Sequence, residues 1–402
     1  MPTAMQSRPP FPVRLPRAAA TGRWLRRSVL GALAAAIATL AVGCAGTGLR
    51  TTRDRSSVTP GAAEPASATP PPAPPIAGTA NPADTPATDS SFHTIAGPDP
   101  RPGDPLVRRG DEMSVCGQLF HTGTRVVLWN DVGGYDAYRP HRHLDETRAT
   151  PRDRNQPDAT ARFGTFRRNL PPAVEARVRA HGWDLEDLRQ VVHQVVIHYD
   201  ACGTSRRCFE VLHDIRGLSC HFLLDVDGTI YQTLDVKERA WHASSANDRS
   251  VGIEIAHIGA EPTSAAPRFS EWYDSDARGP RLSLPANVRT GWPPDLELRP
   301  ARPELIRGPI HGYELAQYDF TREQYDALVK LLASLSRVLP GIRAEVPRGA
   351  DGKVPSGVLS ARDQTEFQGF LGHYHLTTEK HDPGPAFDWE QVLTGVRAVL
   401  AR

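Results

Sequence analysis

Residues 372–389 read GHYHLTTEKHDPGPAFDW and place three histidines, a lysine and two aspartates in one short segment. A loop of this composition has two interpretations, a solvated polar turn or part of a metal site. Asp382 directly precedes Pro383 and Gly384, and a carboxylate at such a turn is held on rigid backbone. A fixed carboxylate near a histidine suits a catalytic zinc ion, which takes three protein ligands and leaves a fourth position to water. The segment can supply two of the three ligands.

The third ligand must come from elsewhere in the chain, and His198 is the best donor. Residues 194–200 read QVVIHYD, in which three successive β-branched residues indicate a buried strand. A histidine at the end of such a strand lies at the rim of a sheet, where sites tend to form. Alone, His198 would more often be a structural residue. Together with the 372–389 loop it predicts a zinc site.

Strands and helices alternate through the rest of the folded region. Residues 220–226 and 229–234 flank an Asp-Gly pair, which is a strong hairpin signal. Residues 125–129 and 250–256 also indicate strands, the first of which adds to the sheet or walls the groove. The pattern predicts an α/β fold with a mixed central β-sheet flanked by helices and a zinc site at the sheet rim. Helices are expected at 171–180, at 205–217, after a capping box at 321–324, and from Asp388 onward.

Residues 1–44 have the features of a signal peptide with a lipobox. Arginines precede an apolar run at 29–42 that is too short to span a bilayer comfortably. The sequence AVGC at 41–44 resembles a bacterial lipobox, in which Cys44 becomes the lipidated first residue, and Ala45 resembles lipoproteins sent to the outer membrane. An ordinary cleaved signal or a single membrane anchor is the alternative. We therefore expect an exported, periplasmic protein anchored to the outer membrane.

The remaining chain divides by composition. Residues 45–105 are rich in Pro, Ala and Thr, cannot bury enough apolar surface to offset their ordering entropy, and are expected to form a disordered linker. The folded domain is expected at 106–402, with an N-terminal extension (106–190) and a long irregular insertion (258–310) that could form part of a substrate groove. The formal net charge is +1, and no basic block indicates nucleic acid as a partner.

Seven short segments, in this order, resemble the zinc-dependent type 2 N-acetylmuramoyl-L-alanine amidases, which are relatives of the peptidoglycan recognition proteins and of phage amidase lysozymes. The segments are VVIHYD, SCHFLLDVDGTIYQ, RAWHA, ND, SVGIEI, GHYH and KHDPGPAFDW, within 194–254 and 372–389. The resemblance implies one Zn²⁺ per chain, a monomer, and hydrolysis of the amide bond between N-acetylmuramic acid and L-alanine. The substrate would be peptidoglycan or muropeptides, in cell-wall degradation or recycling.

The resemblance also implies the metal ligands, which are His198, His373 and Asp382. From spacing alone, either His373 or His375 could reach a metal, because residues two apart in an extended chain face the same way. The family places its ligand directly after a glycine, which selects His373. The choice between the two histidines depends on that resemblance.

Further roles follow from the same resemblance. Glu254 matches the catalytic glutamate, which would act as general base and then as general acid, and Lys380 would stabilise the oxyanion. A solvent-facing strand glutamate and a solvated loop lysine are the alternatives. Four residues match positions near the groove and are expected either to shape the substrate site or simply to pack: His221, Trp241, His242 and Asn247.

Cys202 and Cys208 are separated by five residues, a spacing also found after the first zinc histidine of peptidoglycan recognition proteins. In an exported protein this resemblance implies a disulfide. Cys116 and Cys220 could also pair, which the sequence leaves open. Cys220 stands where recognition-protein amidases usually carry a catalytic tyrosine, so base catalysis would fall to another residue.

Two rival functions remain at this point. One is a membrane-anchored module that binds peptidoglycan without cutting it, and the other is a zinc peptidase that acts within the stem peptide. Binding modules of this kind usually lack the third metal ligand. The presence of Asp382, Lys380 and Glu254 therefore favours catalysis.

Overall fold

The computed structural model describes residues 106–139, 163–164, 166–263, 266–285, 288 and 296–402. The expected signal peptide, Cys44 and the 45–105 linker lie outside these residues. All described residues belong to one compact unit, Gly97–Arg402. Within them, no helix combines the length and the apolar character that crossing a membrane requires.

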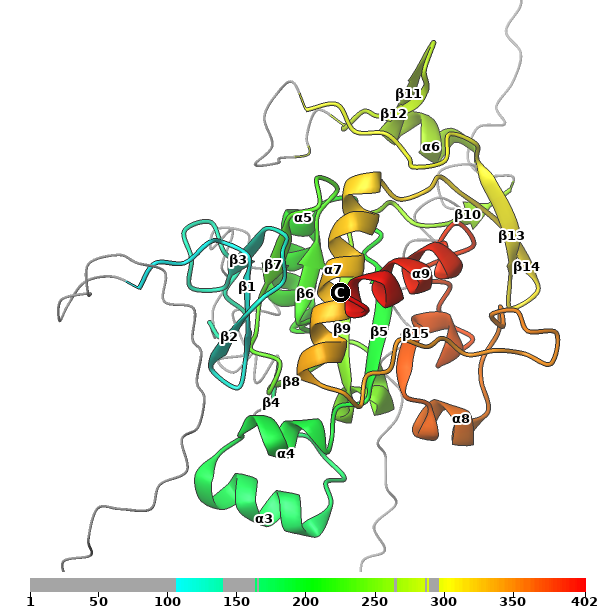
Figure 1. Ribbon diagram of the computed structural model, residues 1–402. Coiled ribbons are helices and arrows are strands. Elements are labelled where there is room, and N and C mark those ends of the chain that lie inside the picture. The colour runs from blue at the N-terminus through cyan, green and yellow to red at the C-terminus, as the bar shows by residue number, and fades with distance from the viewer. Residues whose placement is uncertain (1–105, 140–162, 165, 264–265, 286–287, 289–295) are drawn as a thin grey trace, which may run out of the picture. The chain divides into compact units, whose positions relative to one another are not determined.

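A six-stranded sheet lies at the centre of this unit (Figure 1), in the order β15-β5-β9-β6-β7-β3. The pair β6–β7 is antiparallel and the other neighbours run parallel, so the predicted mixed central sheet is confirmed. Because the central strands are covered on both faces, they read as nearly continuous apolar runs. The strands are β3 (Val126–Leu128), β5 (Gln194–Tyr199), β6 (Phe222–Leu224), β7 (Ile230–Gln232), β9 (Ser250–Ile255) and β15 (Gly369–Gly372).

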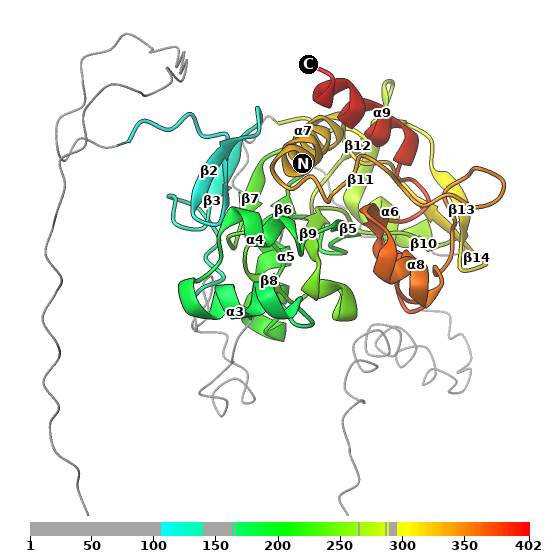
Figure 2. The same cartoon turned by 60° about the horizontal axis from the view of Figure 1, so that its bottom comes forward.

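Helices cover both faces of the sheet. Figure 2 shows α7 (Arg322–Val338) and α9 (Trp389–Leu400) on one side of the strands and α5 (Ser205–Phe209) on the other. The first face packs Ile197 and Ile253 into the main apolar core, and the second packs Leu223 in a cluster with Phe209. Side chains alternate along a strand, so the neighbours of Ile197 and Ile253 in sequence, His198 and Glu254, belong to the α5 face.

The predicted helices are present. The N-terminus of α7 has the capping box, in which Thr321 and Gln324 each accept a hydrogen bond from the other's backbone N–H at 3.0 Å. Asp388 caps α9, and α5 continues as a π-helix over Glu210–Arg216. In the extension, α3 (Pro172–His181) is followed by α4 (Leu185–Arg189).

The extension contributes directly to the sheet. β3 pairs with β7 and forms one edge, as expected for residues 125–129. A hairpin of β1 (Glu112–Val115) and β2 (Gln118–His121) precedes it. Further along the chain, β4 (Phe163–Gly164) pairs with β8 (Arg239–Ala240).

The expectation of an irregular insertion at 258–310 is wrong for much of that range. β14 lies between β10 and β13 in a three-stranded sheet, and β11 and β12 form a hairpin. Prolines hid these strands, because Pro262, Pro280 and Pro309 lie inside β10, β12 and β13 and a proline within a run argues against a strand. The elements are β10 (Glu261–Pro262), α6 (Ala266–Trp272), β11 (Tyr273–Asp276), β12 (Gly279–Leu282), β13 (Ile306–Ile310) and β14 (Tyr313–Gln317). A short helix, α8 (Ala361–Glu366), also escaped sequence analysis.

Candidate metal centre

Three buried donors converge at the end of β5. Asp382 Oδ2 lies 2.8 Å from His198 Nδ1 and 3.0 Å from His373 Nδ1. One ligand atom from each of the three residues falls within 4.8 Å of the others. Their side chains expose little surface, with residue exposures of 2%, 8% and 6% for His198, His373 and Asp382. Two imidazoles and a carboxylate in this arrangement fit a zinc ion with one further position open.

The sheet register brings the two histidines together. β15 runs parallel to β5, with Gly372 opposite Ile197, so the residues that follow this pair, His373 and His198, lie beside each other. Parallel strands carry their carboxyl ends to the same edge, and therefore residues far apart in sequence meet there. The imidazole centroids lie 4.4 Å apart.

Asp382 returns to this edge at the end of the loop that follows β15. Its carbonyl accepts a hydrogen bond from Tyr374 N–H at 3.1 Å. Gly372 permits the close approach, since a Cβ there would lie only 2.8 Å from Pro383 Cδ. The loop is therefore folded back tightly on the strand end that carries His373.

His373 and His375 have different hydrogen-bond partners in the structure. His375 is fully buried, its Nδ1 accepts from Gly372 N–H at 2.9 Å, and its Nε2 donates to the Pro355 carbonyl at 3.0 Å. Both ring nitrogens are therefore occupied by backbone. His373 keeps its Nδ1 directed at Asp382, which is the geometry of a ligand.

The protonation of the donors also suits a cation. Burial, and then the charge of His373, lowers the pKa of His198 to about 4, so this imidazole is neutral at pH 7. Burial raises the pKa of the Asp382 carboxyl, but the charge of His373 and hydrogen bonds from both histidines outweigh burial and hold the pKa below its usual range. Neutral imidazole and ionised carboxylate are the forms that bind metal.

Glu254 stands beside the donor set. It is paired with His198 across the parallel strands β9 and β5, and the two side chains share a face of the sheet. Burial, followed by the charges of Asp382 and Asp200, raises the pKa of Glu254 well above its ordinary value. A buried carboxyl with a raised pKa next to a metal site can take up and release a proton.

Lys380 lies two residues before Asp382 and is half-buried. Its charge acts on the groups of the site, because it opposes the protonation of both His198 and Glu254. The lysine is thus close enough to the donors to interact with charge that develops there.

His242 contacts His198, one of the three donors, directly. Its Nδ1 lies 3.0 Å from His198 Nε2 and its Nε2 lies 3.3 Å from Ser250 Oγ. Gly252 on β9 leaves the space for this ring, because a Cβ there would lie 2.7 Å from His242 Nδ1. Asn247 orders the turn, since its Oδ1 accepts from the backbone N–H groups of His242 and Ala243 at 3.1 and 2.6 Å.

The structure does not place His221 or Asn247 as free substrate contacts. His221 is fully buried, accepts from Gly252 N–H at 3.1 Å and donates to the Glu238 carbonyl at 3.0 Å. Asn247 is likewise buried and uses its amide oxygen on the backbone. Both residues pack the wall behind His242, which is the packing alternative that the sequence left open. Trp241 is half-buried, with a buried indole N–H that has no partner.

The predicted disulfide is absent. Cys202 and Cys208 are both free, as are Cys116 and Cys220. The turn before α5 is closed instead by Asp200, whose Oδ1 accepts from Cys202 N–H at 2.8 Å and Gly203 N–H at 3.0 Å. Cys208 packs with Cys220 in an apolar cluster, at whose edge Cys202 lies. Spacing in the sequence did not determine which groups the two sulfurs would face.

A second group of possible donors lies in the extension. Asp111, Glu112 and His121 approach one another, but their oxygens are already used. Asp111 accepts from His121 Nδ1 and Gly123 N–H, and Glu112 accepts from the N–H groups of Arg109 and Gly110. The carboxylates therefore serve to close the hairpin.

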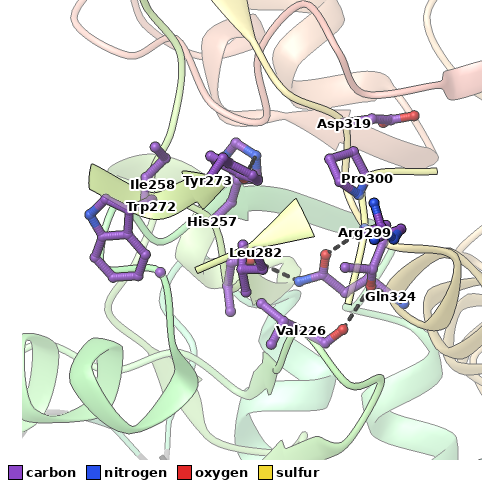
Figure 3. A pocket seen from close by; sticks show the side chains of 13 residues that line it. Val226, His257, Ile258, Trp272, Tyr273, Leu282, Arg299, Pro300, Asp319 and Gln324 are labelled. Carbon is purple, nitrogen blue, oxygen red and sulfur yellow. Dashed lines mark hydrogen bonds between the residues drawn. The ribbon is translucent and has the colours of Figure 1, made fainter. Parts of the chain in front are cut away.

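A small pocket lies between the insertion and the central sheet, and none of the predicted site residues lines it (Figure 3). Trp272 and Tyr273 close it from the insertion. Inside, His257 accepts from Gly259 N–H at 2.8 Å, and its Nε2 lies 3.3 Å from Tyr273 Oη. The histidine that lines the pocket is therefore hydrogen-bonded within the protein, and the pocket is a gap between packed elements.

A mixed sheet with a buried His-His-Asp set at its rim is an arrangement typical of metal-dependent hydrolases. Residues 188–385 match the family described as N-acetylmuramoyl-L-alanine amidase. The three donors, Glu254 and Lys380 all lie in this range. Residues 188–385 therefore form an N-acetylmuramoyl-L-alanine amidase domain, and this enzyme class acts on peptidoglycan.

Three solved structures are also similar. A selenomethionine derivative of AmpD shares 19% identity, over 52% of this chain and 86% of that one, with a TM-score of 0.26. AmpDh3 from Pseudomonas aeruginosa, in complex with anhydromuramic pentapeptide, shares 18%, over 51% and 59%, with a TM-score of 0.29. AmiD from E. coli, with the substrate anhydro-N-acetylmuramic acid-L-Ala-D-gamma-Glu-L-Lys, shares 19%, over 51% and 57%, with a TM-score of 0.29.

The matched region spans less than two thirds of the length of AmpDh3 and AmiD. The assignment to the amidase family rests on the match at residues 188–385. No curated protein matches the chain.

Proposed function

We propose that this amidase is zinc-dependent and holds one Zn²⁺ on His198, His373 and Asp382. The observation that carries the proposal is the convergence of these three buried donors within 4.8 Å, beside a buried carboxyl. The bond cleaved is the amide between N-acetylmuramic acid and L-alanine, in peptidoglycan or in muropeptides. The description of the family matched at 188–385 names this bond.

Zinc at this site would lower the pKa of a bound water to about 7 and polarise the scissile carbonyl. Residues of the chain carry out the proton transfers, stabilise the oxyanion and position the His198 ring. Glu254 takes a proton from the attacking water and delivers it to the leaving L-alanine amine. Lys380 places positive charge where the oxyanion develops. His242 holds the His198 ring through the contact between Nδ1 and Nε2.

Chelation and product analysis test this proposal. The purified protein is incubated with defined muropeptides as isolated, with a zinc chelator, and with zinc added back, and the products are read by mass spectrometry. We expect chelator-sensitive, zinc-restored release of intact stem peptides that carry a free L-alanine amine. Cuts within the stem peptide would indicate a zinc peptidase, and tight binding without cleavage in every metal state would indicate a binding module.

We also propose that the chain is exported and anchored to the outer membrane through lipid on Cys44, which would place the amidase at the periplasmic wall. The AVGC sequence at 41–44 and the apolar run before it support this location. The mass of the mature N-terminal peptide tests it. A mature chain that begins anywhere other than at a modified Cys44 would refute the anchor.

A further inference from the structure

The β13–β14 hairpin, in which β13 ends the 258–310 insertion and β14 follows it, lies against the loop that carries Asp382 and Lys380. In both views of the domain, the hairpin runs beside the segment that leads from β15 to α9 (Figures 1 and 2). Gly308 on β13 permits this packing, since a Cβ there would lie 3.2 Å from Pro385 Cβ. The insertion therefore reaches the metal centre through a specific contact.

Gln317, at the end of β14, makes the central contact with this loop. It is fully buried, its Nε2 donates to the Pro383 carbonyl at 3.1 Å, and its Oε1 accepts from Ala386 N–H at 3.1 Å. One side-chain amide thus satisfies a backbone acceptor and a backbone donor on opposite sides of the turn that follows Asp382. Without Gln317 these two backbone groups would be buried without a partner, which would destabilise the turn.

Gly384, within the same turn, shows how closely the amide is fitted. Its φ is +87°, a conformation that favours glycine, and a Cβ at this position would collide with Gln317 Oε1. The turn and the amide therefore pack face to face, which leaves the segment after Asp382 little room to move.

The tip of the hairpin holds the other side of Asp382. His311 and Gly312 form the tip with positive φ values of 54° and 79°. This geometry directs His311 Nε2 to the Lys380 carbonyl, to which it donates at 2.9 Å. The His311 N–H donates to the Ser356 carbonyl at 2.8 Å, which secures the tip itself.

We propose that the β13–β14 hairpin positions the metal ligand Asp382 and the catalytic Lys380, with Gln317 as the main positioning residue. Gln317 fixes the backbone after Asp382, and His311 fixes the backbone before it. The carboxylate is thereby held between the two histidines. The inference rests on the proposed zinc site, and it gives the β13–β14 hairpin a role in assembling that site.

Gln317→Leu tests the inference, because leucine has a similar volume and removes both hydrogen bonds. The matched control is Gln324→Leu. Gln324 is equally buried, and its amide also bridges two backbone groups, the Thr321 N–H and the Ala256 carbonyl, but it caps α7. Zinc affinity is measured by competition with a chromophoric chelator, kcat and KM are measured at saturating zinc, and Tm is measured in the metal-free state.

We expect Gln317→Leu to weaken zinc binding by about 10–100-fold and to lower kcat in the same range, with KM changed little. Gln324→Leu should lower Tm and leave zinc affinity and kcat at the wild-type values. His311→Asn tolerates the positive φ and should lower kcat with a smaller effect on zinc affinity, because it releases Lys380. This third variant keeps the test decisive if Gln317→Leu fails to fold.

Two results would overturn the inference while leaving the proposed function intact. One is wild-type zinc affinity and kcat in Gln317→Leu together with a loss of Tm like that of Gln324→Leu. The other is unchanged kcat in His311→Asn. Failure of the wild-type protein to bind zinc would instead overturn the proposed function, and the positioning role with it.

Discussion

Replacing Asp382 with asparagine should abolish zinc binding and amidase activity together. Asp382 is the only anionic donor of the set, and its Oδ2 lies within 3.0 Å of both histidine donors. Burial raises the pKa of Asp382, but the charge of His373 and hydrogen bonds from both histidines outweigh burial and hold the pKa below its usual range, so the carboxylate is ionised at neutral pH. A neutral amide removes that charge from a buried site. We expect zinc affinity and kcat/KM each to fall by roughly 10³-fold or more.

Asp235→Asn is the matched control for Asp382→Asn. Asp235 is also buried, and its oxygens accept from the N–H groups of Cys116 and Gly117 at 2.8 and 2.7 Å, away from the donor set. This variant should lose stability and keep zinc affinity. If Asp382→Asn bound zinc as tightly as the wild type, the ligand assignment would be wrong.

Glu254→Gln should lower kcat without weakening zinc binding. The carboxyl lies beside the donors without being one of them, so zinc affinity should stay within a few-fold of the wild type. Loss of the general base should lower kcat by about 10²–10⁴-fold. Metal content and kcat are measured on the same preparation. A variant that loses zinc and activity in parallel would show that Glu254 is a ligand or a structural residue.

The same variant should be more stable than the wild type at neutral and higher pH when both are metal-free. Burial raises the folded-state pKa of Glu254 above its unfolded value. A raised carboxyl pKa means that stability is fully present below the unfolded pKa and is lost as pH rises toward the folded pKa. Glutamine cannot ionise, so the advantage of Glu254→Gln should grow with pH above about 4.5. Urea unfolding of the chelated proteins across pH 4–8 measures this difference.

Glu112→Gln should change the folding stability in the opposite direction. Burial raises the pKa of Glu112, but hydrogen bonds from the N–H groups of Arg109 and Gly110 outweigh burial and lower the pKa. Stability from a lowered carboxyl pKa is present above the unfolded pKa and is lost as pH falls. Glu112→Gln should therefore destabilise the protein at neutral pH. Equal effects of the two substitutions would contradict the burial argument for Glu254.

Much of the fold could be predicted because its central strands carry local signals. The Val195–Ile197 run, the Asp227-Gly228 turn and the Thr321–Gln324 capping box each encode an element within a few residues, and each element is present. β11 to β14 form two tight hairpins, but they were missed because their strands carry weak local signals. Their residues alternate weakly and are interrupted by prolines, so no short window identifies them.

Some residues of the candidate site could likewise be identified from the sequence, and the roles of others could not. His198 and Glu254 could be singled out because a polar residue in an apolar strand is conspicuous, and the resemblance to the family selected His373 and Asp382. The roles of His221, His375 and Gln317 depend on which backbone groups their side chains meet, which only the folded chain determines. The Cys202–Cys208 spacing suggested a bond that the fold does not form.

The central claim is that His198, His373 and Asp382 bind a catalytic zinc ion. The most direct test is a crystal structure of the zinc-loaded protein with anomalous data collected at the zinc edge. We predict a single strong anomalous peak bonded to His198 Nδ1, His373 Nδ1 and the Asp382 carboxylate, with no protein atom in the remaining position. No peak at these donors in zinc-loaded, active protein would contradict the account.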